Sequence, residues 1–115
     1  IYLRPQRYTK EFVDREEYFT LAFFGEEQRK ALTLCGSKSG RDVDKVKECG
    51  FTVAGAACGA PYFEEAGLVL VCKKAYWQDM DPTHFLDGEL DGKWYPEKDY
   101  HRIFIGEIVE VLKKN

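Results

Sequence analysis

The chain has 115 residues, 44% of them hydrophobic and 32% charged, which is enough for one domain around one hydrophobic core. Its net charge of -3 argues against nucleic-acid or anionic-membrane binding through general attraction, so a bound anion would need a local basic cluster. The sequence has neither a signal-peptide pattern nor an apolar run of the ~20 residues that a membrane helix needs, and we expect a soluble, cytoplasmic protein.

The first half of the chain predicts short strands that alternate with short helices. Apolar and β-branched runs indicate the strands, while Glu, Gln, Lys and Ala indicate the helices. In order, we expect the end of a strand over Ile1–Leu3, a helical turn over Tyr8–Val13, a strand over Tyr18–Phe24, and helices over Glu26–Leu34 and Asp42–Cys49. Thr9 is the expected N-cap of the helical turn, and Gly50 closes the last helix.

The second half is richer in strand and loop signals. Phe51–Pro61 is small and glycine-rich, as in a loop or an irregular edge strand, whereas Glu65–Trp77 is apolar enough for a buried strand. Asp79–Asp99 contains Asp-Pro, Asp-Gly and Tyr-Pro pairs, which predict a surface loop. β-Branched residues over Arg102–Leu112 predict a final strand. This order, without regular βαβ spacing, favours a mainly β fold, an antiparallel barrel with helical insertions.

Four cysteines, at positions 35, 49, 58 and 72, are unevenly spaced and form no C-x-x-C pair. This spacing argues against a zinc ribbon or a thioredoxin-type motif. We therefore expect free thiols in a reducing compartment that behave mostly as small hydrophobes, with Cys35 as the one placed to be partly exposed.

Two basic clusters have the composition of an anion site. Arg4–Lys10 brings two arginines and a hydroxyl to the start of a helical turn, and Ser37–Lys45 brings hydroxyls and cations to the start of a later helix. Helix N-termini offer unpaired N–H groups, and arginine binds phosphate oxygens through two donors. Each cluster alone has a simpler interpretation, a solvated basic turn or an ordinary capped helix. Two of them in one short chain favour a shared phosphate site.

His101 lies at the entry to the last predicted strand. A histidine in that position can contact a cofactor or transfer a proton near neutral pH, although a lone histidine is more often structural. His84, in the predicted surface loop Asp79–Asp99, has the features of a surface residue. Two distant histidines predict no metal site, and no Ser-His-Asp or Cys-His arrangement can be assembled from the sequence.

Three longer runs then occur in the order found in a known family: R-P-Q-R-Y-T-K-E-F, C-G-S-K-S-G-R-D-V-D-K and Y-H-R-I-F-I-G-E-I-V-E-V. The segment A-Y-W-Q-D-M-D-P-T-H-F lies between the second and the third and fits the same family. Together these runs resemble the flavin reductase-like family, which includes the flavoredoxins. The resemblance implies an FMN-binding split β-barrel and a homodimer.

What the resemblance implies can be placed on residues of this chain. The stretch from Arg7 and the loop from Ser37 would lie by the FMN phosphate or its ribityl chain. The cofactor-binding residues would then be Arg7, Tyr8, Thr9, Ser37, Ser39, Gly40, Arg41 and Lys45. His101 would lie near the flavin and the nicotinamide, as the catalytic residue.

The resemblance implies an oxidoreductase, an NAD(P)H-dependent flavin reductase in which NADH or NADPH passes hydride to flavin N5. A monooxygenase or another electron acceptor would lie downstream. Two alternatives stay open: an FMN-carrying electron-transfer protein without nicotinamide activity, and an inactive fragment. The last arises because family members have strands before the position of Ile1, so residues 1–115 would be the C-terminal two-thirds of a single domain, truncated at its N-terminus.

Overall fold

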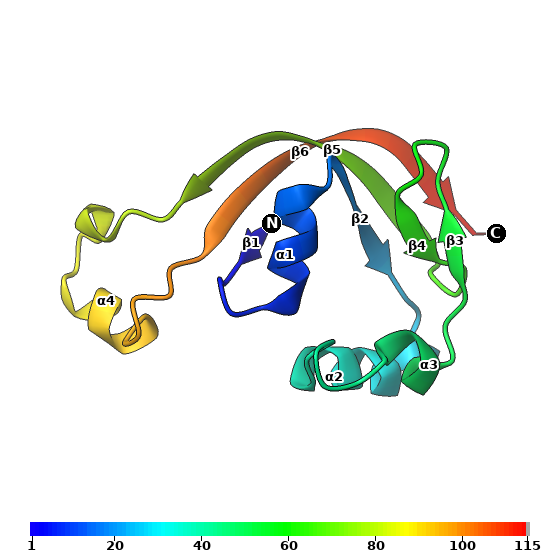
Figure 1. Cartoon of the computed structure of the whole chain (residues 1–115), viewed down its shortest axis with the longest axis horizontal. Helices are drawn as coiled ribbons and strands as arrows, with labels where there is room; N and C mark the ends of the chain where they lie inside the picture. The colour runs from blue at the N-terminus through cyan, green and yellow to red at the C-terminus, as the bar shows by residue number, and fades with distance from the viewer. Residues whose placement is uncertain (115) are drawn as a thin grey trace.

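The computed structural model describes residues 1–114 and centres on a four-stranded antiparallel sheet (Figure 1). Its strands are β1 (Tyr2–Leu3), β2 (Tyr18–Phe23), β5 (Leu68–Asp79) and β6 (Arg102–Lys113), in the order β1-β6-β5-β2. A separate two-stranded sheet pairs β3 (Val53–Gly55) with β4 (Pro61–Phe63). The fold is mainly β with helical insertions, as expected, and the described strands form open sheets that do not close into a barrel.

Helices occupy the connections between the strands. They are α1 (Tyr8–Arg15), the 3-10 turn η1 (Glu26–Gln28), α2 (Arg29–Ser37), α3 (Lys45–Cys49), the 3-10 turn η2 (Pro82–His84) and α4 (Glu89–Trp94). Gly50 ends α3 with a φ of 69°, a left-handed conformation that glycine adopts without strain. Within residues 1–114, no helix has both the length and the apolar character needed to cross a membrane.

β5 and β6 form a curved two-stranded ribbon that arches over the molecule (Figure 1). Their register shifts after Val71 and again after Lys74, and bulges of this kind bend and twist a strand. Only the first half of β5 lies in the core, whereas residues 73–79 are mostly exposed. The expectation of a buried strand is therefore wrong for its second half, because the ribbon continues beyond the elements that cover it (Figure 1).

The sheet is packed on both faces. Side chains alternate between faces along a strand, so Phe19 and Thr20 of β2 point in opposite directions. Phe19 joins one core cluster with Val13 of α1, Cys72 of β5 and Phe104 of β6. The cluster on the other face consists of Ala60, Ala66, Val69 and Val71. Helix α1 thus covers one face, and the segment around β4 covers the other.

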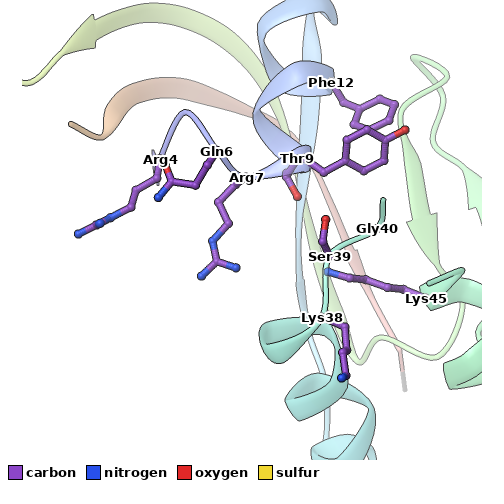
Figure 2. Close-up of a pocket in the computed structure, with 10 residues that line it drawn as sticks. Arg4, Gln6, Arg7, Thr9, Phe12, Lys38, Ser39, Gly40 and Lys45 are labelled. Atoms are coloured by element: carbon purple, nitrogen blue, oxygen red, sulfur yellow. The ribbon is translucent and has the colours of Figure 1, made fainter. Parts of the chain in front are cut away.

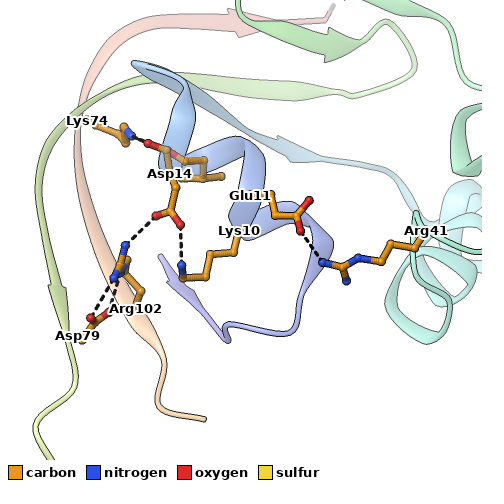
Figure 3. Close-up of polar contacts among 8 residues, drawn as sticks. Lys10, Glu11, Asp14, Arg41, Lys74, Asp79 and Arg102 are labelled. Carbon is orange, nitrogen blue, oxygen red and sulfur yellow. Dashed lines mark hydrogen bonds and ion pairs between the residues drawn. The ribbon is translucent and has the colours of Figure 1, made fainter.

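Polar contacts hold α1 against the ribbon (Figure 3). Lys74 of β5 donates from Nζ to two carbonyl oxygens in the last turn of α1, at 2.6 and 2.9 Å, which satisfies that end of the helix. Arg102 of β6 donates to both carboxyl oxygens of Asp79, at 2.6 and 3.0 Å, and to Asp14 at 3.1 Å. Although desolvation acts against it, hydrogen bonds from Lys10 and Arg102 lower the pKa of the Asp14 carboxyl.

Two local expectations are wrong. The residue that precedes α1 in an extended conformation is Arg7, while Thr9 lies within the first turn of the helix. The excursion between β5 and β6 contains a helix, α4, where only loop was expected. Asp87 accepts the N–H of Glu89 at 3.0 Å and so favours a helical start there, which the Asp-Gly pairs had obscured.

The same excursion is closed at its base. The Met80 N–H donates to the carbonyl oxygen of His101 at 3.1 Å, immediately beyond the last pair of the ribbon. The intervening segment carries α4 away from the rest of the sheet (Figure 1). Its return places His101 beside β1, where Tyr2 packs edge-on to the imidazole at 6.4 Å.

Candidate functional site

The start of α1 and the loop before α3 enclose a cavity of about 370 Å³ (Figure 2). Arg7, Tyr8 and Thr9 line it from the first basic cluster of the sequence. Ser39, Gly40 and Lys45 line it from the second. Six of the eight residues expected to bind a cofactor are therefore brought together around one space, although the two clusters are far apart along the chain.

The first wall is the start of α1. The Arg7 backbone is extended, with φ -72° and ψ 130°, and its carbonyl accepts the N–H of Lys10 at 3.1 Å. No described side chain caps this end of the helix, so its first N–H groups are available to an anion. In Figure 2 the Thr9 hydroxyl is directed toward Ser39 across the cavity.

The second wall is the loop of residues 38–44, which is held by its own hydrogen bonds. The Ser39 hydroxyl accepts the N–H of Arg41 at 3.1 Å, and the Ser39 carbonyl accepts that of Asp42 at 3.0 Å. Asp44 caps α3 by accepting the Lys47 N–H at 3.2 Å. These bonds keep the loop compact beside α1.

Gly40 is a point of close approach between the two walls. A Cβ atom at this position would lie 2.9 Å from Cδ2 of Tyr8. The Tyr8 ring is held on two sides, because Phe12 packs edge-on to it at 4.9 Å and the Arg41 guanidinium lies over it at 4.9 Å. The close contact of loop and helix therefore depends on glycine at position 40.

The cavity is electropositive. Its lining includes Arg4, Arg7, Lys38 and Lys45 but no acidic residue. Arg4 is paired with Asp99 at 3.0 Å, and Lys45 donates to a carbonyl oxygen of α2 at 2.7 Å. Within residues 1–114, Arg7 and Lys38 have neither an ion pair nor a side-chain hydrogen bond. These two cations can bind an anion without first breaking an internal contact.

Two of the expected binding residues do not line the cavity. Arg41 donates to the Glu11 carboxylate at 2.8 Å and to the Gln6 carbonyl at 2.9 Å, so its guanidinium ties the loop to α1 (Figure 3). Ser37 ends α2, and its hydroxyl donates to the carbonyl of Leu34 at 3.4 Å. The sequence places both residues in the second basic cluster, but it could not show that their side chains point away from the cavity.

A second cavity, also of about 370 Å³, contains His101. It shares Arg4, Arg7, Thr9 and Lys45 with the first, so the two cavities are neighbours that have one wall in common. The expected catalytic histidine, from the end of the chain, thus lies beside the first cavity, which is built from the first half of the chain.

Tyr95 orients this histidine. Its hydroxyl lies 2.5 Å from Nδ1 of His101, and its ring packs edge-on to the imidazole at 5.5 Å. Burial, and after it the positive charge of Arg4, lower the pKa of His101 below its ordinary value, while Asp99 acts in the opposite direction. The imidazole is therefore mostly neutral near pH 7 and can accept a proton.

The sequence interpretation missed four residues of the first cavity: Arg4, Gln6, Phe12 and Lys38. Arg4, Gln6 and Lys38 lie within the two basic clusters of the sequence. Including every residue of those clusters in the expected site would have found them. Phe12 follows Tyr8 by four positions, a spacing that places both side chains on one face of α1.

The four cysteines are free thiols in the structure. Cys58 is exposed and Cys72 is buried, whereas Cys35 and Cys49 are half-buried. In the part of the chain that the structure describes, no three histidine, cysteine or acidic side chains gather closely enough to hold a metal ion.

The family model for the flavin reductase like domain matches residues 1–115. An FMN-binding protein from Thermus thermophilus with bound p-hydroxybenzaldehyde is 20% identical with a TM-score of 0.74, over 99% of this chain and 53% of that one. Flavoredoxin from Desulfovibrio vulgaris (Miyazaki F) is 21% identical with a TM-score of 0.72, over 97% and 50%. A split-barrel protein from Shewanella frigidimarina is 18% identical with a TM-score of 0.73, over 100% and 50%.

These similarities confirm the predicted fold class, the split barrel with helical insertions. The chain spans about half the length of the solved structures that it matches. No curated protein matches the sequence.

Proposed function

This chain belongs to the flavin reductase like domain family, and from that premise we propose that it is an FMN-binding oxidoreductase whose first cavity holds the FMN phosphate. The observation that carries the proposal is the meeting of two basic clusters in one cavity, next to a second cavity that His101 lines. In this proposal a phosphate anchor lies next to a neutral imidazole.

The donor set of the cavity fits a phosphate group. A phosphate monoester carries about two negative charges at neutral pH. Arg7 and Lys38 have no ion pair within residues 1–114, and Thr9 and Ser39 offer hydroxyl groups. Charge-assisted hydrogen bonds of this kind are roughly twice as strong as neutral ones, and arginine makes them with two donors at once. We assign Arg7 as the principal phosphate ligand.

FMN, when bound, supplies the electron chemistry. The residues of the chain bind the cofactor, orient it and keep water from it. His101, held by Tyr95, presents its imidazole to the second cavity, where it can position a polar group or move a proton. We therefore place the reacting end of the cofactor on the His101 side, toward the second cavity.

The reaction that we propose is NAD(P)H-dependent flavin reduction, with NADH or NADPH as the hydride donor. The adjacency of the two cavities supports it, because anchoring the phosphate in the first leaves the second for the groups that react. A monooxygenase component, or another electron acceptor, would then use the reduced flavin.

An electron carrier is the alternative, and it is favoured by the shared fold with a flavoredoxin. In that case the chain would hold FMN in the same way, but a protein partner would supply the electrons. NAD(P)H would then leave the bound flavin oxidised.

We also propose that the protein acts as a homodimer. Three apolar side chains of β6, Ile105, Ile108 and Val111, are 54%, 55% and 56% exposed in the single chain. A second copy of the chain that paired along this strand would cover such exposed apolar side chains. Sedimentation at micromolar concentration should show a dimer, and a clean monomer would contradict this proposal.

The experiment that tests the function is an absorption spectrum. The purified chain is mixed with FMN, desalted and followed anaerobically as NADH or NADPH is added. Retained yellow colour that bleaches supports the reductase, and retained colour that persists supports the carrier. A protein that elutes colourless at every FMN concentration refutes FMN binding by these residues.

A further inference from the structure

Two cysteines lie close together at the base of the cavity loop. Cys35 is in the last turn of α2, Cys49 is the last residue of α3, and their sulfur atoms are 3.8 Å apart. A disulfide bond is about 2.05 Å long, so the two sulfurs need to approach by roughly 1.8 Å. Rotation of two side chains and a small shift of one short helix can supply that movement.

The position of the pair relates it to the cavity. Residues 38–44, which form the second wall, run from the end of α2 to the start of α3 and lie between the two cysteines in sequence. Lys45 donates from Nζ to the Cys35 carbonyl at 2.7 Å, and both residues line the second cavity. A bond between Cys35 and Cys49 would therefore close the loop at its base.

We propose that Cys35 and Cys49 are a redox modification site, at which a small-molecule disulfide such as oxidised glutathione forms a reversible Cys35–Cys49 bond that holds the cavity loop in place. The site is independent of the proposed flavin chemistry, because the oxidant is the small disulfide. Bonds of this kind in a reducing compartment are transient and serve as redox sensors.

The chemistry is thiol–disulfide exchange. Cys35 lines a cavity and is the first to react: its thiolate attacks one sulfur of the small disulfide, whose other half leaves as a thiolate and takes up the proton that Cys35 lost. Cys49 then loses its proton and displaces the remaining half from Cys35. Two protein thiols are oxidised, and one small disulfide is reduced to two small thiols.

The environment of Cys49 fits the second role. Its thiol donates toward the Ala31 carbonyl at 3.6 Å, inside the contact between α2 and α3. Burial, and after it the hydrogen bond with Cys35, raise the pKa of the Cys49 thiol. Its raised pKa makes Cys49 the less reactive thiol of the two toward the small disulfide, while its sulfur lies beside Cys35 for the second step.

The chain provides its own controls. Cys58 is exposed, and Cys72 is buried against Phe19 and Phe104 in the core. In the described part of the chain, neither has a second cysteine sulfur within hydrogen-bonding distance. If exposure alone decided the reaction, the oxidant would modify Cys58. Because only Cys35 and Cys49 have their sulfur atoms close together, a disulfide within the described chain should form between these two.

The test is peptide mapping of the complete chain without reducing agent, after equilibration with oxidised glutathione. We expect a Cys35–Cys49 cross-linked peptide that has lost two hydrogens and that dithiothreitol reverts, with Cys58 carrying only a glutathione adduct. Cross-links that involve Cys58, or a Cys35 that stops at the glutathione adduct, would overturn the proposal.

A variant and a second measurement test the details. Cys49→Ser should trap the glutathione adduct on Cys35, and an unmodified Cys35 in a variant of unchanged circular dichroism would overturn the assigned order. Hydrogen exchange compares the oxidised and reduced forms of the natural chain. Amides of residues 38–44 should exchange several-fold more slowly after oxidation, and equal rates would refute the effect on the loop.

Discussion

The hydroxyl oxygen of Tyr95 lies 2.5 Å from Nδ1 of His101 and 3.3 Å from the sulfur of Met80. A phenol has one proton, so Tyr95 can donate it to the neutral imidazole. It can also turn that proton toward Met80 and accept an N–H from a protonated imidazole. The ring of His101 is thus held in one orientation in both charge states.

The lowered pKa of His101 predicts a pH-dependent stability. Because the folded state binds the His101 proton less tightly than the unfolded state does, this contribution to stability is present at neutral pH. It is lost as the pH falls below the ordinary histidine value of 6.5. Urea unfolding of His101→Gln should therefore show a shallower loss of unfolding free energy over this range than the natural chain shows. Parallel curves would contradict the prediction.

Arg7→Ala should weaken binding of FMN far more than binding of riboflavin, which lacks the phosphate. Loss of one charged hydrogen bond of about 1.5–3 kcal/mol corresponds to a roughly 10- to 100-fold weaker Kd for FMN. Fluorescence titration with both flavins measures the ratio. Arg15→Ala is the control, because Arg15 is exposed at the other end of the same helix and does not line the cavity; it pairs with Glu16 and lies over the Phe12 ring. Equal weakening of both flavins would assign Arg7 to structure.

Arg41→Ala should behave differently from Arg7→Ala. Its guanidinium ties the loop to Glu11 and Gln6 and lies over Tyr8, so its removal loosens the second wall. We expect both flavins to bind less tightly by a similar factor. A loss confined to FMN in the same fluorescence titration would show that Arg41 contacts the phosphate directly.

Gly40→Ala should disturb the cavity, because its Cβ would meet the Tyr8 ring. Overpacking of this kind costs about 1–3 kcal/mol of unfolding free energy. Gly92→Ala is the matched control: it lies inside α4 with open space around it, and alanine should stabilise the helix by about 0.5–1 kcal/mol. Denaturant unfolding measures the change in unfolding free energy for both variants. A more stable Gly40→Ala would show that the Tyr8 ring moves aside without cost.

Arg102→Lys should destabilise the fold by about 1 kcal/mol, because a lysine keeps the charge but loses the two-donor contact with Asp79. The guanidinium also lies over the Trp77 ring at 4.2 Å, a contact that lysine reproduces poorly. Arg29→Lys, in an exposed ion pair with Glu26, should change stability by less than about 0.5 kcal/mol. Equal effects in thermal unfolding would refute the special role of Arg102.

Both walls of the first cavity could be predicted from the sequence, because the signals are local. Hydroxyls and cations at a helix start define an anion site within a few residues, whatever the rest of the fold does. The directions of the side chains could not be predicted in this way. Arg41 faces Glu11 because α1 packs beside the loop, and this contact joins distant parts of the chain.

For the strands, too, the sequence predicted where they lie but not how deeply they are buried. Runs of apolar residues located β2, β5 and β6, but the burial of β5 depends on how far α1 and β4 reach along the ribbon. Helix α4 was missed because Gly92 and the Asp-Gly pairs weaken the helical signal. His101 was recognised as a candidate from its place at a strand end, while its partner Tyr95 belongs to the excursion and had no signal of its own.

The hydrogen bond between Met80 and His101 closes the base of the segment that carries α4. Since the two ends are held there, lengthening the segment costs only chain entropy, about 0.6 kcal/mol for each doubling of its length. Leu86 lies within this segment and its side chain is fully exposed, so it contributes nothing to the packing of the sheet. Insertions and substitutions around Leu86 are therefore the changes that evolution can try at least cost, so the outline of the molecule can vary there between lineages while Tyr95 and Asp99 keep their contacts with His101 and Arg4.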